Sequence, residues 1–427
     1  MGYTPRVSQQ DGHKQSLDFG GVPGNLMMTI GLPVFTAYLY FAVRFNGGAP
    51  LPGPESDWAG FFAALKPTWE AAFVYLAWVG LQAAFQLWLP GKVVQGTELP
   101  GGGRLDYKMN GPASLVASFL IVGAGHAAGV WDIAYIADNF GALLSVMTIS
   151  AYAMSVWLYF YGKRVDDHST GVLIHDFWMG TGRNPRLPQT GIFDLKFFFE
   201  ARPGLILWIL VDFSFAAVQY REYGFVSTAM ALVCVLQALY VIDYFANEPA
   251  ILTTMDIKHE NFGLMLAFGD MVWVPMTYSL QAAYLVHHVH DLPWWAAVGI
   301  ALMAVTGLMT FRAVNNQKNK FRLDPDNAVI WGKKAEYIQT EHGSKLLLSG
   351  FWGWSRHFNY VGDELMAMSW SMPCGFASPI PWFYPVYFAI LLIHRQIRDD
   401  EHCEAKYGED WLEYKKRVPW RIIPGIY

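Results

Sequence analysis

The sequence predicts an all-α fold, a polytopic integral membrane helical bundle with about ten transmembrane helices. Composition is the first reason: 53% of the 427 residues are hydrophobic and only 15% are charged, whereas about a quarter of the residues in a soluble chain are charged. Aromatic residues reach 16%, which suits a protein with Trp and Tyr side chains at both bilayer interfaces. The spacing of the apolar segments is the second reason.

A helix crosses a bilayer core with about 20 mostly apolar residues. Eight segments meet this requirement, at roughly 26–45, 70–90, 112–131, 141–161, 203–220, 225–245, 265–288 and 294–312. A ninth and a tenth span are expected at 361–378 and 381–394. Pro379 and Pro381 separate these last two, which form either two full crossings or a helical hairpin.

Lys and Arg residues are concentrated in the loops after the even-numbered spans and in the C-terminal tail. The positive-inside rule therefore places both termini in the cytosol, at the endoplasmic reticulum of a eukaryote or the inner membrane of a bacterium. Such a basic face serves either anionic lipid or an anionic cofactor. The net charge of −5 argues against a nucleic-acid partner. The cysteines follow no metal-ligand spacing, so no metal site is expected.

The stretch 346–364, LLLSGFWGWSRHFNYVGDE, places a dense group of polar residues where the chain meets the membrane. Polar groups at that depth are costly unless they bind something. Four further segments stand out: LPGKVVQGTELPGGGRLDYKMNG at 89–111, GVLIHDFWMGTGRNPR with FDLKFFFEARPG within 171–204, LYVIDYFANEPAILTTMDIKHENFGLMLAFGDMVWVPMTYSLQ at 239–281, and the tail IRDDEHCEAKYGEDWLEYKKRVPWRIIPGIY. No GxGxxG or Walker motif occurs, so a nucleotide site would be built from loops and helix ends.

Together the five segments resemble the sterol reductase family, the integral membrane enzymes that reduce double bonds of sterols with NADPH. The RLDYKMNG and EARPG forms look most like the C14 type, with the C7 type as the alternative. His175 and Arg183 depart from the family, which often carries an aromatic residue and a Leu there. A prenylcysteine-type membrane methyltransferase shares only R-H-x-N-Y. A sterol-binding scaffold without catalysis is the remaining, non-enzymatic reading.

The resemblance implies an NADPH site near the cytosol. Lys318 and Arg322, four residues apart on one helix face, would clamp the phosphates of the cofactor, or else are an interfacial pair that extends toward water. Arg395 and Asp399 have the same spacing and match cofactor-contacting positions, or else form a helix pair. Further candidate contacts are Trp352, Arg356, His357, Asn359, Tyr360, Asp363 and Tyr407.

An isolated C=C bond resists hydride until an acid protonates it. For a C14=C15 bond, protonation of C15 leaves a cation at C14, which a hydride then quenches. Tyr240 is the first candidate for the acid, with Asp243 beside it in the sequence. Tyr244, Asp256 and Asp399 are the alternative donors. The alternative is that these residues belong to a structural network.

The sequence is also expected to divide into three parts. A polar N-terminal segment occupies 1–25, five helices occupy 26–220, and five more helices with a cytosolic tail occupy 221–427. The last part would form the cofactor and sterol pockets. The sterol would enter from the bilayer and the cofactor from the cytosol. The oligomeric state stays open.

Overall fold

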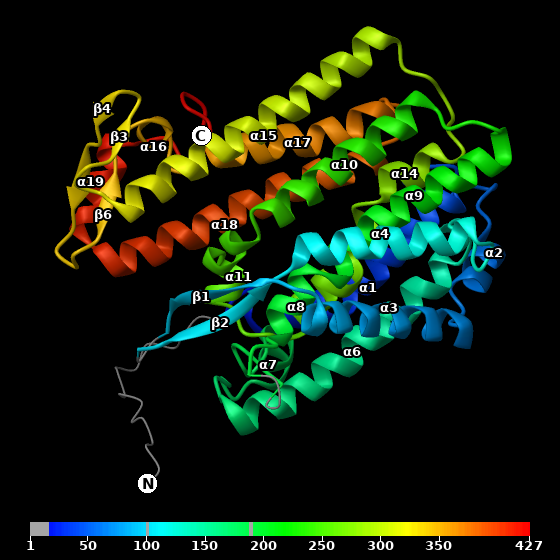
Figure 1. Ribbon diagram of the computed structural model, residues 1–427, viewed down its shortest axis with the longest axis horizontal. Coiled ribbons are helices and arrows are strands. Elements are labelled where there is room, and N and C mark those ends of the chain that lie inside the picture. The colour runs from blue at the N-terminus through cyan, green and yellow to red at the C-terminus, as the bar shows by residue number, and fades with distance from the viewer. Residues whose placement is uncertain (1–16, 100–101, 188–190) are drawn as a thin grey trace.

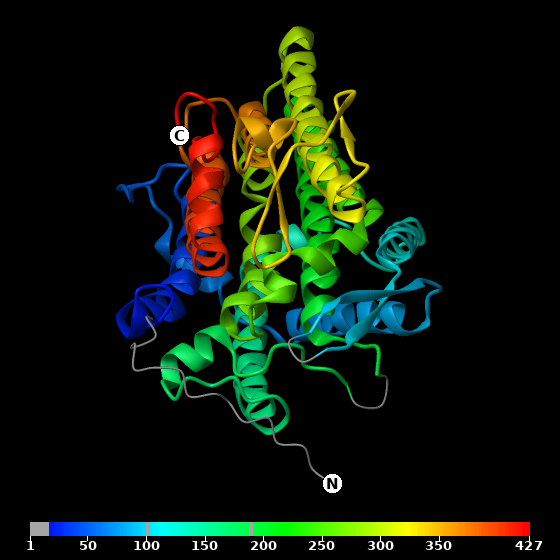
Figure 2. The ribbon, with the colours of Figure 1, turned by 90° about the vertical axis from the view of Figure 1, so that its left-hand side faces the viewer.

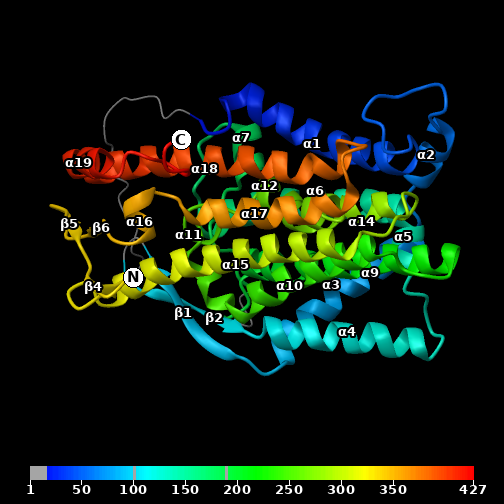
Figure 3. The same ribbon diagram turned by 90° about the horizontal axis from the view of Figure 1, so that it is seen from above.

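The computed structural model describes residues 17–99, 102–187 and 191–427, and it is a bundle of long helices (Figure 1). The helices run side by side, as the view from above shows (Figure 3). This arrangement confirms the predicted mostly helical membrane fold. Most of the predicted N-terminal polar segment, residues 1–16, lies outside the described part of the chain.

Within the described ranges, the first part of the chain contains nine helices and one β-hairpin. In order these are α1 (Gly21–Arg44), α2 (Trp58–Ala64), α3 (Trp69–Trp88), β1 (Lys92–Glu98), β2 (Arg104–Met109), α4 (Gly111–Ala127), α5 (Tyr135–Asp138), α6 (Phe140–Val165), α7 (Leu173–Met179), α8 (Leu195–Ala201) and α9 (Pro203–Tyr223).

The second part begins with helices broken into short pieces: α10 (Thr228–Ala246), η1 (Glu248–Thr253), α11 (Met255–Lys258), α12 (Leu264–Phe268), η2 (Gly269–Trp273), α13 (Val274–Thr277) and α14 (Leu280–Leu285). It continues through α15 (Trp294–Leu323), β3 (Val329–Ile330), β4 (Lys333–Lys334), β5 (Tyr337–Gln339), β6 (Lys345–Leu347), α16 (Phe351–Trp354), α17 (Asn359–Ser371), η3 (Met372–Cys374), η4 (Ile380–Trp382), α18 (Phe383–Tyr407) and α19 (Glu409–Arg417).

Six helical segments in the described ranges are long and apolar enough to cross a membrane: α1, α3, α6, α8 with α9, α10 and α15. The other four expected spans are present in different forms. The third is α4, an apolar helix of 17 residues. The seventh is interrupted by the π-helical turn η2, with Pro275 in the next turn. The ninth is the 13-residue α17, whereas the tenth, α18, continues to Tyr407, well past its expected end at 394.

The Gly- and Pro-rich segment before α4 forms an antiparallel hairpin, which the sequence pattern did not predict. Val94 pairs with Tyr107 in its register. Tyr107 is buried against Phe197 of α8, with ring centroids 5.3 Å apart. Because glycines interrupt the alternation of apolar residues in this segment, its strands carry a weak sequence signal.

One end of the bundle collects the polar elements. The short strands β3 to β6, α16 and α19 gather there, and the β1–β2 hairpin reaches toward the same end (Figure 1), which faces the viewer in Figure 2. A close backbone contact joins α15 to α17 nearby: a Cβ on Gly307 would lie 2.7 Å from the carbonyl oxygen of Gly362. Only glycine allows the two helices to approach so closely. The expected division of the chain at residue 220 falls within α9 and stays a prediction.

Candidate functional site

An ion pair between α18 and α11 lies at the centre of the candidate site. Arg395 Nη2 donates to Asp256 Oδ2 at 2.5 Å. Solvent reaches 31% of the Arg395 side chain and 32% of the Asp256 side chain, so this pair is open to a ligand. Arg398, one turn further along α18, pairs with the buried Glu260 at 2.9 Å. The 255–260 turn is therefore held to α18 through two carboxylates.

A second ion pair joins α10 to α15. The Arg312 guanidinium donates to both carboxylate oxygens of Asp243, with its Nε 2.8 Å from Oδ2. The sequence reasoning missed Arg312, although an arginine at the end of a predicted span is a recognisable signal. Asp243 lies close to Tyr240 in the sequence. In the structure it is turned toward Arg312, because a guanidinium binds a carboxylate with two parallel hydrogen bonds.

Tyr240 lies on α10 among aromatic side chains. Its ring centroid is 5.2 Å from that of Trp370 and 5.9 Å from that of Trp208. Asp363, Arg312, Asp243 and Arg395 all lie within electrostatic reach of its hydroxyl. The structure thus brings Tyr240 into the neighbourhood of both ion pairs, although within the described ranges no hydrogen bond joins it to a carboxylate.

The predicted residues after α16 surround Asp399. His357 Nε2 lies 3.6 Å from Asp399 Oδ2, and the His357 ring stacks on Tyr360 at 5.0 Å. Burial, with the charges of Lys318 and Arg356, lowers the pKa of His357 to about 3. His357 is therefore neutral at pH 7 and forms no charged pair with Asp399. Asn359 Oδ1 is buried and has no hydrogen-bond partner in the described part of the chain, so it can accept one from a ligand.

Lys318 and Arg322 lie at the polar end of α15, as predicted. The Lys318 ammonium stands 3.9 Å from the centroid of the Trp352 ring. Trp352 is buried, and its indole N–H donates to the carbonyl of Val314 at 2.9 Å. In this structure Trp352 therefore forms a cation–π contact with Lys318, and that face of its ring is not free to stack on a cofactor.

Two further cations, Lys258 and Lys406, lie near Arg322 and were not predicted as site residues. Burial and the charges of Arg322 and Lys406 lower the pKa of Lys258. Among the described residues, no acidic side chain forms an ion pair with Arg322, Lys258 or Lys406. Like charges that gather without a counter-ion suit a ligand with several phosphate oxygens. Tyr407 lies beside them, with Lys406 Nζ 5.0 Å from its ring centroid.

Arg356 has a different position from the other predicted contacts. Its Nη1 donates to the carbonyl oxygens of Val418 and Pro419 at 2.9 and 3.3 Å, and it is buried. The side chain ties α16 to the C-terminal segment after α19. The ligand-binding roles of all these residues remain predictions, but the donor set of Lys318, Arg322 and Asn359 fits a phosphate-bearing cofactor with an amide group.

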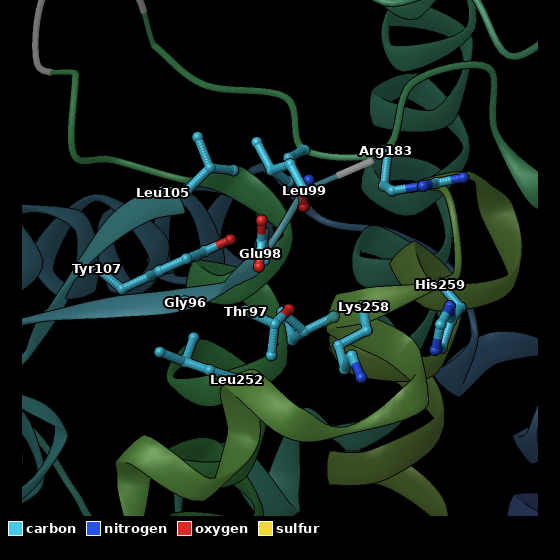
Figure 4. Close-up of a pocket in the computed structure, with 12 residues that line it drawn as sticks. Gly96, Thr97, Glu98, Leu99, Leu105, Tyr107, Arg183, Leu252, Lys258 and His259 are labelled. Atoms are coloured by element: carbon cyan, nitrogen blue, oxygen red, sulfur yellow. The ribbon is translucent and has the colours of Figure 1, made fainter. Parts of the chain in front are cut away.

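A cavity of about 100 Å³ lies under the β1–β2 hairpin. Arg183, one of the two departures from the resembled family, lines it with Lys258 and His259, and burial lowers the pKa of His259 to about 4. Figure 4 shows Arg183 and His259 on one side of this cavity and Tyr107 on the other. The space is far too small for a dinucleotide or a sterol, and it borders the candidate site at Lys258.

The fold and the site together define a helical membrane protein with a polar, cation-rich site at one end of the bundle. The model of the ergosterol biosynthesis ERG4/ERG24 family matches residues 13–427, and the chain belongs to this family. The match extends over almost the whole chain, whereas the methyltransferase alternative would explain only R-H-x-N-Y.

Several relatives are similar along nearly their full length. The Delta(14)-sterol reductase of Methylotuvimicrobium alcaliphilum is 48% identical over 406 residues, which cover 94% of this chain and 94% of the relative. The Delta(14)-sterol reductase of Dictyostelium discoideum is 42% identical, covering 96% of this chain and 92% of the relative. The mouse Delta(14)-sterol reductase TM7SF2 is 39% identical, covering 99% and 100%.

Proposed function

We propose that this protein reduces the C14=C15 double bond of a sterol with NADPH. The proposal is supported by relatives that are named Delta(14)-sterol reductase and are similar to this chain over nearly their full length. The observation that carries it in the structure is the open Arg395–Asp256 pair near Tyr240, with Asp399 one turn along α18 in electrostatic reach of Lys318. A reductase requires a reductant, and this arrangement suits an anionic one.

Tyr240 is the proposed proton donor. Asp243 and Asp256 each accept hydrogen bonds from an arginine, so their carboxyl oxygens are directed toward a guanidinium rather than toward a substrate. A phenol has a reference pKa near 10 and stays protonated at neutral pH. Transfer of its proton to C15 breaks the C14=C15 π bond and leaves a tertiary cation at C14.

When bound, NADPH supplies the hydride that quenches this cation. Lys318 and Arg322 would hold its phosphates, and Asn359 would accept a hydrogen bond from its carboxamide. Arg395 and Asp399, one turn apart on α18, would orient its remaining polar groups near Tyr240. The sterol would enter from the bilayer, and the cofactor from the cytosol, where we also place both termini.

Reduction of defined sterols by the purified protein tests this proposal. We expect NADPH to support reduction of a sterol with a C14=C15 bond, while a sterol with only a C7=C8 bond stays unchanged, as mass spectrometry of the products would reveal. Reduction of the C7 substrate alone would instead assign the protein to the C7 type. Absence of NADPH oxidation with either sterol would refute the proposed cofactor.

Substitution of Tyr240 by Phe tests the donor. The substitution keeps the ring that packs on Trp370 and removes only the hydroxyl. We expect turnover to fall by about 10²–10⁴-fold, the usual contribution of a positioned acid, with NADPH affinity unchanged. Tyr244→Phe on the same helix is the matched control, and we expect it to retain turnover. Near-normal turnover of Tyr240→Phe would rule this residue out as the donor.

A further inference from the structure

Lys196 is a buried charge for which the proposed mechanism has no role. It belongs to α8, and none of its surface is exposed. Its ammonium donates hydrogen bonds to the carbonyl oxygens of Asp256 and Ile257, at 2.8 and 2.9 Å. A third hydrogen bond reaches the carbonyl oxygen of Glu260 at 2.7 Å. The ammonium therefore uses all three of its donors, which offsets the cost of removing it from water.

The three acceptors belong to the 255–260 turn, whose side chains contact α18. Asp256 binds Arg395, and Glu260 binds Arg398. Figure 1 shows α11 between α8 and α18. Lys196 thus holds the backbone of the turn from one side, while the two carboxylates hold α18 from the other.

We propose that Lys196 is a positioning residue for the reaction: by fixing the 255–260 turn, it places the Asp256 carboxylate against Arg395. This inference rests on the proposed function, which gives Arg395 its place at the cofactor. The helix α11 has only four residues, too few to be stable by itself. A cation at the carbonyl end of such a turn supplies the hydrogen bonds that a longer helix would make internally.

A double-mutant cycle on kcat/KM for NADPH separates this role from general support of the fold. Lys196→Met keeps the length of the side chain and removes the charge and the donors, and Asp256→Asn removes the charge that binds Arg395. We expect Lys196→Met to lower kcat/KM about tenfold in the wild-type background, which is about 1.4 kcal/mol. In the Asp256→Asn background we expect a further loss of about twofold or less, because the residue that Lys196 positions is already disabled.

Lys108→Met is the matched control. Lys108 also donates to a backbone carbonyl, that of Leu87 at 2.8 Å, but it belongs to β2, and its ammonium makes this hydrogen bond to α3 rather than to the 255–260 turn. We expect the effects of Lys108→Met and Asp256→Asn on kcat/KM to multiply. If the effects of Lys196→Met and Asp256→Asn on kcat/KM also multiply, Lys196 supports only the fold and the proposal is overturned.

Lys196→Gln keeps a donor and is the second variant if Lys196→Met cannot be purified. Its effect should also depend on the Asp256 carboxylate, and wild-type kcat/KM in Lys196→Gln would overturn the proposal. Failure of the proposed function would be seen in the wild-type protein, which would not oxidise NADPH with a C14-unsaturated sterol. The same cycle is then measured on sterol turnover with the reductant that supports the wild-type protein.

Discussion

Two arginine–carboxylate pairs in this bundle have similar chemistry and opposite surroundings. Arg202 and Glu248, which join the start of α9 to η1, are 2.7 Å apart with 0% and 2% of their side chains exposed. Arg395 and Asp256 are 2.5 Å apart with about a third of each side chain exposed. The first pair is closed to any ligand, whereas the second can exchange partners. Exposure, more than the pairing itself, distinguishes a structural charge from a functional one.

The contacts around each pair support this distinction. Arg202 also donates to the side-chain oxygen of Asn110 at 2.8 Å, and Glu248 accepts from the backbone N–H of Gly111 at 2.9 Å. A Cβ on Gly111 would lie 2.2 Å from the Phe245 ring, so the backbone fills the space around the closed pair. These bonds tie the hairpin and α4 to α9 and η1. The open pair instead adjoins Tyr240 and Asp399, the residues proposed for chemistry.

Breaking the closed pair should have the largest effect on stability. Arg202→Met leaves the Glu248 carboxylate buried without its partner, and the loss of one member of such a pair costs about 3–5 kcal/mol. We expect a large fall in the melting temperature of the purified protein, measured in detergent. If the variant melts like the wild type, the closed pair does not stabilise the fold.

Breaking the open pair should affect binding more than folding. We expect Arg395→Gln to weaken NADPH binding by about 2–4 kcal/mol, as for truncation of one partner of a buried charged contact, with a much smaller change in melting temperature than Arg202→Met. Titration of NADPH against each purified variant measures this difference. Unchanged NADPH affinity in Arg395→Gln would show that Arg395 does not contact the cofactor. The open pair would then have no functional role that distinguishes it from the closed pair.

The cations at the end of α15 sharpen the comparison further, because neither Lys318 nor Arg322 forms an ion pair within the described part of the chain. Replacement of both Lys318 and Arg322 by Ala should narrow the preference for NADPH over NADH about tenfold, or about 1.4 kcal/mol, since only NADPH carries the 2′-phosphate. Dissociation constants for the two cofactors measure this preference. An equal loss for both would indicate contacts to the pyrophosphate instead.

The last expected effect concerns pH. Burial lowers the pKa of His357 from 6.5 to about 3 in the folded protein, so below pH 6.5 the unfolded chain binds a proton that the folded protein does not. Stability is therefore fully present above pH 6.5 and falls as the pH decreases toward 3. We expect His357→Gln to flatten the decrease in melting temperature between pH 6.5 and 4. An identical decrease in both proteins would contradict this assignment.

The sequence predicted the membrane bundle and the segments that form the site, because hydropathy and short motifs are local properties. It did not predict partners that come from distant elements. Tyr240 and Asp243 are neighbours on α10, yet Asp243 binds Arg312 of α15. Trp352 was named as a candidate cofactor contact, and in the structure Lys318 stands over its ring. Such contacts depend on how helices pack, which the order of residues along one helix does not specify.

The glycine contact between α15 and α17 has a mechanical consequence. The Cβ positions of Gly307 and Gly362 lie within 2.7 Å of the facing backbone, so the two helices have almost no freedom to slide or separate without losing contact along their length. They form one stiff strut that carries Lys318 on one member and Asn359 on the other. We therefore expect any widening of the proposed site to come from movement of α18 or of the 255–260 turn against this strut.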